Sequence, residues 1–412
     1  MLPKLLNLPR ARELMAARGL DGLVVQLPIN VYYLSGYWGF LMNAERFDAA
    51  YFAVLPRQAD RPGALVLPAL ELRRLIAEGG SWVGEVQAYS SALDDESVAE
   101  AGIAYEGWPV RPGAPLTELE QRWVATVRAH RERVASDALH ALARAMRAAG
   151  LVGGEVLSDD PRVGGWLEAC GVPLRRFHYD GSFLNEIRKI KTTPEINIMR
   201  EAARINETAL HEAAGVLQEG ATWSEVETAY LAAMARRGAR GSYCISGVGG
   251  LPAGRARRGE PILLDALGTY RRYHGDFGRC AVIGEPGGEL RRRHAALCAG
   301  WDSVQPLLRP GTRYSEIART AVAAIRGRGF PEFRYATPHG LGLEHTDDPK
   351  PVGVAPGTKP DQVLEPGMVL NVDMPFTEIG WGSVHLEDTV LVTERGFERL
   401  TSSGLDILQC GR

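Results

Sequence analysis

The stretch ILLDALGTYRRYHGDFGRC, residues 262–280, decides the fold of this protein because it sets two carboxylates among apolar residues. Asp265 follows the apolar run ILL, and Asp276 comes after the sequence TYRRYHG. We expect an apolar strand that ends at Asp265, then a turn, then a strand that carries Asp276. A carboxylate at the end of so apolar a strand is expected to be buried, which is costly unless it is paired or bound to a metal.

A second stretch, MVLNVDMPFTEIGWGSVHLEDTVLVT at residues 368–393, repeats this arrangement with Asp373 and Glu387. The segments that precede the two stretches also match each other. GATWSEVETAYLAAMARRG at 220–238 aligns with GTRYSEIARTAVAAIRGRG at 311–329, including the Ser-Glu pair, the Ala-Ala pair and the closing Arg-Gly. Each half therefore reads as a helix followed by a carboxylate-bearing hairpin. A duplicated α+β domain with pseudo-two-fold symmetry is predicted, in which the carboxylates meet at the central axis.

Four converging carboxylates would repel one another strongly, so a cation is expected between them. The segment TPHGLGLEH adds a histidine to the set. Such a carboxylate-rich group with one imidazole favours two divalent ions, Mn²⁺ first, with Co²⁺, Fe²⁺ or Zn²⁺ also suitable. Two such ions, bridged by carboxylates and a hydroxide, would supply a nucleophile at neutral pH. The predicted ligands are Asp265, Asp276, His339, Asp373 and Glu387.

Each of these residues also has an ordinary interpretation. A single Asp at the end of a strand is more often a turn residue, and His339 by itself is more often a loop histidine. Turn chemistry does not predict the duplicated placement of the carboxylates, however. The repeat therefore favours the metal site.

The first part of the chain predicts a separate α/β domain, residues 1–184, followed by a second domain, 185–412. Residues 9–19 have the pattern of an amphipathic helix, and residues 117–150 have a long helical pattern. Short apolar runs between them predict strands: DGLVVQLP, AAYFAVLP, GALVLPA, EVLSDD and LRRFHYD. Strands that alternate with helices are typical of an α/β domain. This half contains no glycine-rich loop of the kind that cradles phosphate.

Two helix starts can be predicted in the second domain. In KTTPEI, Thr193 can cap a long helix, and Pro194 suits its first turn because the missing N–H is not needed there. Thr222 and Glu225 form a capping-box pair at the start of the first repeated helix.

Composition indicates a globular enzyme-like protein of two domains. The 412 residues are 45% hydrophobic and 24% charged, and the net charge of -3 favours neither nucleic acid nor a membrane surface as a partner. The five cysteines lack CxxC spacing, which argues against a disulfide framework and a structural zinc site and suits a reduced, cytoplasmic location. We find neither a signal-peptide core nor an apolar run of the roughly 18 residues that span a bilayer.

Residues 185–412 resemble the pita-bread metallopeptidase family, which includes prolidase, aminopeptidase P, methionine aminopeptidase and the metal-free relative creatinase. The motifs that carry the resemblance are the spaced pair Asp265 and Asp276, HGLGLEH, EPGMVLNVDMP and HLEDTVLVTE. The stretch GLDGLVVQLPINVYYLSGYWG resembles the N-terminal domain of creatinase and prolidase. The resemblance implies a dinuclear metal site with the five ligands above. It also implies a homodimer in which each N-terminal domain helps to close the partner's active site.

The sequence departs from the family pattern at several places. Asp373 stands where the family has Glu, and it would inherit the role of general base. His385 stands where the family has Arg, and His345 matches a second family histidine with a spacing that is one residue tighter. We expect His345 to donate a proton or a hydrogen bond to the substrate. The upstream histidine of the peptidases is missing from GVGGLPAGRARRGEPILLD. Candidate catalytic residues are therefore Asp373, His345 and His385.

Three functions remain open at this point. The near-complete ligand set favours a metal-dependent hydrolase of a C–N bond, nearest to an Xaa-Pro dipeptidase or aminopeptidase. The departures at substrate-contacting positions would also suit a relative that acts on a small molecule, such as creatinase or the metal-dependent dimethylsulfoniopropionate lyases. A binding module that only kept the fold is the third. Arg255 and Trp38 are candidate substrate contacts, although a solvated surface arginine and a packed aromatic are the ordinary interpretations.

Overall fold

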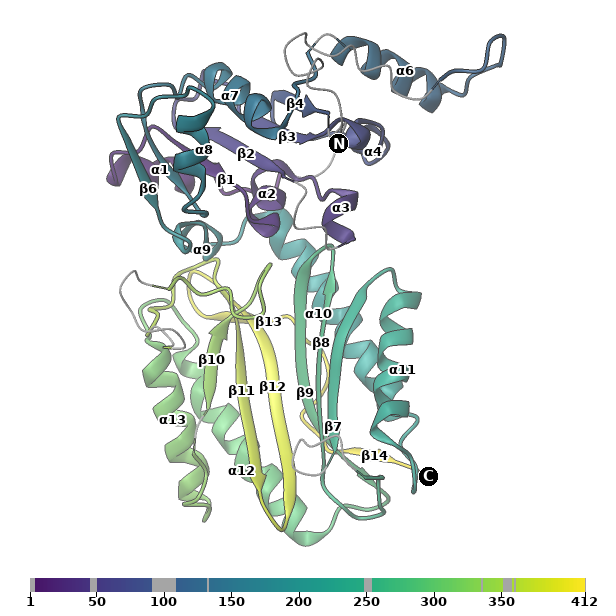
Figure 1. The fold of residues 1–412 in the computed structure, drawn as a ribbon. Helices are drawn as coiled ribbons and strands as arrows, with labels where there is room; N and C mark the ends of the chain where they lie inside the picture. The colour runs from purple at the N-terminus through teal and green to yellow at the C-terminus, as the bar shows by residue number, and fades with distance from the viewer. Residues whose placement is uncertain are drawn as a thin grey trace. The chain divides into compact units, whose positions relative to one another are not determined.

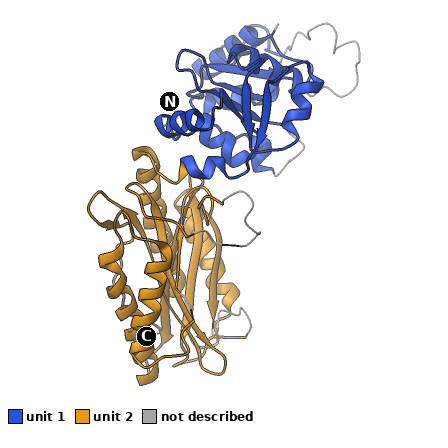
Figure 2. Ribbon diagram, turned by 90° about the vertical axis from the view of Figure 1, so that its left-hand side faces the viewer, with its two compact units in different colours: residues 1–187 blue, residues 188–412 orange. Residues whose placement is uncertain are grey.

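The computed structural model describes most of the chain and divides it into two compact units, Met1–Ile187 and Arg188–Arg412 (Figure 2). The division falls within residues 183–196, FLNEIRKIKTTPEI. No helix in the described residues is long and apolar enough to cross a membrane. The structure describes residues 4–44, 50–90, 109–131, 133–247, 254–334, 336–350, 358 and 361–411.

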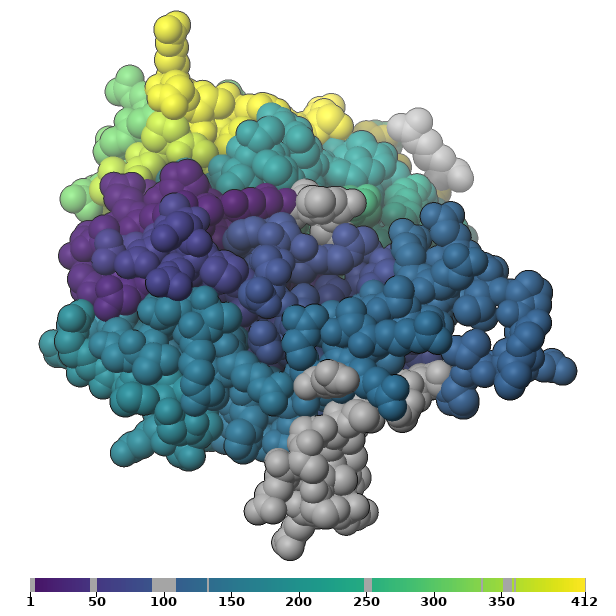
Figure 3. Space-filling model, turned by 90° about the horizontal axis from the view of Figure 1, so that it is seen from above, coloured from purple at the N-terminus to yellow at the C-terminus, as the bar shows by residue number. Residues whose placement is uncertain are grey.

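The first unit is built on a six-stranded mixed sheet with helices around it (Figure 1). The strand order is β4-β3-β2-β1-β5-β6; β2 is antiparallel to both β1 and β3, and the other pairs are parallel. Atoms of this unit can be followed by their purple to teal colours in Figure 3. The strands are β1 (Gly22–Val25), β2 (Phe52–Pro56), β3 (Ala64–Pro68), β4 (Glu85–Tyr89), β5 (Glu155–Ser158) and β6 (Arg176–Tyr179). The helices are α1 (Leu8–Ala17), α2 (Pro28–Ser35), α3 (Phe40–Asn43), η1 (Ala69–Glu71), α4 (Leu72–Ala77), α6 (Glu118–His130), α7 (Ala138–Ala148), α8 (Val163–Ala169) and α9 (Phe183–Arg188).

The long helix predicted over residues 117–150 is wrong, because the structure has two helices, α6 and α7, in its place. Between them Ala135 pairs with the end of β4: its N–H donates to Ala88, and its carbonyl accepts from Ser90. A backbone engaged with a strand cannot continue a helix. Asp137 then caps α7, since its carboxylate accepts from the N–H of His140.

The second unit contains an eight-stranded sheet whose main path runs β10-β11-β12-β9-β8-β7, with β13 beside β12 and β14 beside β9 (Figure 1). Helices α10 and α11 pack on the β7–β9 half, and α12 and α13 pack on the β10–β12 half. The strands are β7 (Arg240–Gly247), β8 (Ile262–Tyr270), β9 (Tyr273–Ile283), β10 (Thr337–Gly340), β11 (Val369–Glu378), β12 (Gly382–Val392), β13 (Phe397–Arg399) and β14 (Leu408–Cys410). The helices are α10 (Thr193–Ala214), α11 (Trp223–Arg236), α12 (Gly288–Val304), η3 (Gln305–Leu307) and α13 (Tyr314–Gly327).

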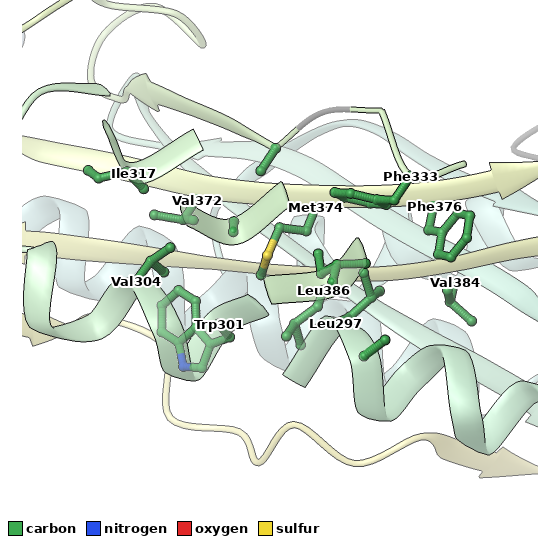
Figure 4. Close-up of a cluster of buried hydrophobic side chains, with 14 of the residues drawn as sticks. Leu297, Trp301, Val304, Ile317, Phe333, Val372, Met374, Phe376, Val384 and Leu386 are labelled. Carbon is green, nitrogen blue, oxygen red and sulfur yellow. The ribbon is translucent and has the colours of Figure 1, made fainter. Parts of the chain in front are cut away.

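The predicted internal repeat is confirmed. Helices α11 and α13 come from the two matching segments, and hairpins β8–β9 and β11–β12 follow them. The hairpins meet where β9 pairs with β12 at the centre of the sheet. Each half has its own apolar core beneath its hairpin; Figure 4 shows the one in which Leu297 and Trp301 of α12 lie beside Val372 and Met374 of β11 and Leu386 of β12.

The expectation that Asp265 ends its strand is wrong. Asp265 is the fourth residue of the nine-residue strand β8, and Asp373 likewise lies inside β11. The first turn comes later, at Arg271 and Arg272, whose φ angles are 47° and 72°. Two consecutive positive φ angles are what a two-residue hairpin turn requires. The carboxylates therefore project from the middle of continuous strands rather than from turns.

The helix starts are partly as predicted. Helix α11 begins with the expected capping box of Thr222 and Glu225. Helix α10 is capped by Thr192 rather than Thr193. The Thr192 hydroxyl accepts from the N–H of Glu195, and the N–H of Thr192 donates to the Glu195 carboxylate. Pro194 lies in the first turn, as predicted.

Candidate metal centre

Strand pairing brings the predicted carboxylates onto one face of the central sheet. Asp265 on β8 pairs with Gly278 on β9, which pairs in turn with Glu387 on β12. Glu387 pairs with Asp373 on β11. Directly paired residues point to the same face, as does Asp276, two residues before Gly278. The row of side chains therefore crosses the junction between the two halves of the repeat.

The alternation of each strand sends the neighbouring residues into the apolar cores. Leu264 and Ala266 flank Asp265 and are buried in the core that contains α10 and α11. Val372 and Met374 flank Asp373 and are buried in the core that contains α12 and α13. Because successive side chains of a strand point to opposite faces, the carboxylates project away from the helices. The apolar residues thus fix the strands while the polar residues line the other face.

The carboxylates are crowded and poorly solvated. Burial and the facing carboxylate of Asp276 raise the pKa of Glu387 well above its usual range. Burial raises the pKa of Asp265 to about 6, with a further increase from Asp276 and a partial decrease from His385. Oε2 of Glu387 is buried and has no hydrogen-bond partner in the described part of the chain. A buried, unpartnered carboxylate oxygen beside other carboxylates is a poor hydrogen-bonding arrangement but a good set of ligand atoms for a cation.

Two groups of side chains have the spacing of metal ligands. One consists of Asp276, His339 and His345, and the other of Asp265, His385 and Glu387. Within each group the ligand atoms lie within 4.8 Å of one another. Four of the five ligands predicted from the sequence belong to these groups. The donor set of carboxylates and imidazoles therefore fits divalent ions such as Mn²⁺, Fe²⁺, Co²⁺ or Zn²⁺.

Asp373, the fifth predicted ligand, belongs to neither group. Its Oδ1 lies 2.7 Å from Nε2 of His385, and its side chain is 25% exposed. Asp373 therefore borders the centre, where water can reach its carboxylate.

The two histidines that depart from the family pattern occupy different environments. Nε2 of His345 lies 3.2 Å from Oδ2 of Asp276, and its side chain is 44% exposed. The ring of His345 also lies beside that of His339, which is itself buried. His385 is only 1% exposed. His345 can therefore meet solvent and substrate, whereas His385 is part of the buried floor.

A shell of polar contacts positions the centre. Arg279 donates to Asp388 Oδ1 at 2.9 Å and to the carbonyl of Glu387 at 2.8 Å. Sequence reasoning did not identify Asp388 as its partner. The side-chain amide of Asn371, also missed, donates to Oε1 of Glu387 at 2.8 Å. These contacts fix β12 against β9 and orient Glu387.

The loop that carries His345 is held by two aspartates that the sequence reasoning missed. Asp348 accepts from the N–H of Gly340 at 2.7 Å, and Asp347 is paired with the buried guanidinium of Arg188 at 2.7 Å. Two adjacent acidic residues after HGLGLEHT were the available signal, but Arg188, the partner of Asp347, lies far away in the sequence. The contacts fix the loop between His339 and Asp348.

The two candidate substrate contacts, Arg255 and Trp38, have neighbours within the chain. Arg255 is exposed and donates to the carbonyl of Gly220 at 2.7 Å, next to the start of α11. The half-buried Trp38 donates its indole N–H to Asn43 at 3.1 Å and meets Tyr32 edge to face. Part of the segment in which the peptidase histidine is missing, residues 248–253, lies outside the described residues.

Comparison with known proteins agrees with this fold. Residues 197–394 match the model of metallopeptidase family M24, and residues 8–153 match the creatinase/prolidase N-terminal domain. The Xaa-Pro dipeptidase of Pyrococcus furiosus is 28% identical over 246 residues, which cover 57% of this chain and 69% of that protein. The counterpart from Pyrococcus horikoshii is 27% identical over the same shares of the two chains.

Solved structures extend the likeness over nearly the whole chain. The prolidase from Pyrococcus horikoshii OT3 has a TM-score of 0.69 at 19% identity and covers 97% of this chain and 99% of its own. The Xaa-Pro dipeptidase from Bacillus anthracis also has a TM-score of 0.69, at 21% identity, with 97% and 98% covered. The predicted pita-bread fold is thereby confirmed. The two family models, the relatives and the repeated hairpins with their carboxylates show that this chain is an enzyme of metallopeptidase family M24 with a creatinase/prolidase-type N-terminal domain.

Proposed function

We propose that this enzyme is an Xaa-Pro dipeptidase, a hydrolase that cleaves the peptide bond before a C-terminal proline. The observation that carries the proposal is that each ligand group combines side chains from both sides of the β9–β12 junction. At this junction Oε2 of Glu387 is buried and has no hydrogen-bond partner among the described residues. The relatives from two Pyrococcus species that bear this activity in their names support the choice of substrate.

The metal centre holds two divalent ions in this proposal. Asp265 and Glu387 serve one ion, Asp276 and His339 the other. The carboxylate-rich set favours Mn²⁺, and Co²⁺, Fe²⁺ or Zn²⁺ would also suit it. When bound, such ions polarise the scissile carbonyl and lower the pKa of water.

Two further side chains act on the substrate. Asp373 receives the proton of the attacking water, since its carboxylate is partly exposed and its Oδ1 is oriented by His385. His345 donates a hydrogen bond to the developing oxyanion, or a proton to the leaving proline nitrogen, because its exposed ring lies beside Asp276. Both groups border the buried ligands, so neither needs to leave its strand or loop to reach a bound dipeptide.

Three other features belong to the proposal. The protein acts as a homodimer, in which Trp38 of one subunit helps to cover the cleft of the other. Arg255 meets the carboxylate of the peptide, for which a guanidinium is well suited. The location is cytoplasmic, and the five free cysteines fit a reducing compartment. Light scattering of the purified protein would test the dimer directly.

The experiment is a proline-release assay with metal-loaded protein. The chain should be saturated with Mn²⁺ or Co²⁺, checked for bound metal, and incubated with a series of Xaa-Pro dipeptides. We expect release of proline by the natural protein and its loss in Asp276→Ala. Asp302→Ala removes an exposed carboxylate of α12 and serves as the matched control, with activity unchanged.

The assay also separates the peptidase from the small-molecule alternative. A protein that carries its full complement of metal and yet releases no proline from any dipeptide would exclude the dipeptidase. A creatinase-like or lyase-like substrate would then be the one to seek.

A further inference from the structure

His385 lies among the candidate metal ligands rather than in a position where it would only pack against the sheet. It lies on β12 two residues before Glu387, so both side chains project from the same face. Its backbone pairs with Pro375 of β11, while its ring reaches across to the neighbouring strand β9. The ring is thus part of the row of metal-ligand candidates rather than of either apolar core.

The space for the ring is made by Gly278. A Cβ atom built on Gly278 would lie 2.3 Å from Cε1 of His385 and 2.4 Å from its Nδ1. Any residue with a side chain would therefore displace the imidazole. Because Gly278 is paired with Asp265 on one side and Glu387 on the other, the ring occupies the position between these two carboxylates.

The two ring nitrogens have unequal partners. Nε2 lies 2.7 Å from Oδ1 of Asp373. Nδ1 is buried, with no hydrogen-bond partner among the residues described. A buried nitrogen without a hydrogen-bond partner lowers the stability of the fold. Oε2 of Glu387 also lacks a hydrogen-bond partner among the described residues, since its contact with Nε2 of His385 is 3.7 Å long. A Cβ atom on Gly278 would lie 3.0 Å from this oxygen, so an ion near the glycine could bind both the oxygen and Nδ1.

We propose that His385 is a metal ligand, which completes one of the two metal sites together with Asp265 and Glu387. The three side chains already have ligand spacing. A ligating histidine typically donates its other N–H to a carboxylate, which fixes the ring. Asp373 is that carboxylate here, and Nδ1 is the nitrogen with an open lone pair. The inference rests on the proposed function only in requiring that the protein bind divalent ions.

The short side chain at position 373 gives a physical reason why His385 rather than Asp373 would bind the ion. Asp is one methylene shorter than the Glu expected there, and Asp373 stays outside both ligand groups. His385 bridges the resulting gap, since it contacts Asp373 and reaches the Asp265–Glu387 pair. Asp373 is consequently left free of the ion and available as the base.

The added imidazole should change the choice of metal. Imidazole favours ions such as Co²⁺, Fe²⁺ and Zn²⁺, whereas an all-carboxylate site favours Mn²⁺. With His385 as a ligand, both sites contain a nitrogen donor. We therefore expect the ratio of Co²⁺ to Mn²⁺ affinity to fall when His385 is removed.

The test counts coordinated imidazoles in Co²⁺-loaded protein by proton NMR. Co²⁺ shifts the exchangeable N–H proton of each bound imidazole far outside the normal range. We expect His385→Ala to lose one such signal and to bind its second Co²⁺ at least tenfold more weakly. His294→Ala removes a half-buried histidine of α12 that contacts the carbonyl of Leu405, and it should keep every signal. Retention of one tightly bound Co²⁺ in His385→Ala shows that the variant is folded.

A second variant separates a ligand from a residue that merely orients Asp373. Asp373→Asn should keep both Co²⁺ ions and the His385 signal if His385 is the ligand. Loss of one ion in Asp373→Asn, or an unchanged number of shifted signals in His385→Ala, would overturn the inference. Neither measurement uses peptide hydrolysis, so a protein that cleaves no dipeptide can still support it.

Discussion

Glu387 on β12 lies directly opposite Gly278 on β9, where the two halves of the repeated domain meet. The pair brings carboxylates from both hairpins together and leaves room above the glycine for His385. At this position the two repeated hairpins meet, and His385 of the second hairpin lies among their carboxylates.

Replacement of Gly278 by alanine should disrupt the metal centre while the hairpins persist. The new methyl group would overlap the ring of His385 and approach Oε2 of Glu387 to 3.0 Å. We expect the affinity for Co²⁺ to fall at least tenfold, as measured by calorimetric titration. Gly288→Ala is the matched control, because nothing lies within 4 Å of its Cβ position. Unchanged metal binding in Gly278→Ala would show that the ring can move away freely.

Removal of Arg279 should destabilise the fold strongly. Its buried guanidinium pairs with the buried carboxylate of Asp388 at 2.9 Å, and Arg279→Ala would leave that carboxylate with only the longer contact to Arg399 Nε at 3.7 Å among the ion pairs of the described residues. Breaking a buried pair in this way costs about 3–5 kcal/mol. Arg292→Ala, which breaks an exposed pair with Glu289, should cost less than about 1 kcal/mol. Urea unfolding of the two variants would measure the difference, and equal losses would contradict the structural role of Arg279.

Glu387→Gln should have opposite effects on the metal-free and metal-loaded protein. Without metal, the substitution relieves burial of a carboxylate among like charges, so the variant should be more stable by about 1–3 kcal/mol. With saturating divalent metal, the natural protein should gain more stability, because an ion bound at 100 times its dissociation constant contributes about 2.7 kcal/mol. Thermal melts in chelator and in Co²⁺ should therefore cross over. A variant that is less stable in both conditions would contradict this account.

Glu195 should make stability depend on pH. Burial raises the pKa of its carboxyl to about 7, although the N–H of Thr192, the charge of Lys191 and the hydroxyl of Tyr273 oppose the shift. The folded state thus holds the proton more tightly than the unfolded chain. This contribution is fully present below about pH 4.5 and is lost as the pH rises through 7.

The variant Glu195→Gln keeps an acceptor for Thr192 and removes the titration. Its free energy of unfolding relative to the natural protein should increase by up to about 3 kcal/mol between pH 4.5 and pH 8. Denaturant unfolding at a series of pH values measures it, with the exposed Glu316→Gln as control. A difference that stays constant across this range would show that Glu195 does not hold the proton.

Much of the fold of the second domain could be predicted because its sequence pattern occurs twice. The matching helical segments, the paired hairpins and the capping box of Thr222 and Glu225 each depend on residues close together in sequence. Such local patterns are visible without coordinates. The candidate ligands were also recognisable, since duplicated carboxylates in apolar strands have no ordinary explanation.

The errors arose where distant contacts override local preference. The helical pattern of 117–150 is broken because Ala135 pairs with the end of β4. Asp265 was expected to end its strand, since an apolar run stops there, but pairing with β9 carries β8 on to Tyr270. Sequence alone could not weigh these partners against local propensity.

The sequence by itself determined the repeat, the two domains' fold class and the set of acidic and imidazole groups from which a centre could be made. Only the tertiary structure decided how these groups are combined. The register of β9 against β12 places Gly278 between Asp265 and Glu387, and it thereby admits His385 to the centre while Asp373 remains at its border. The physical reason is that a one-residue change of register would turn every one of these side chains to the other face of the sheet.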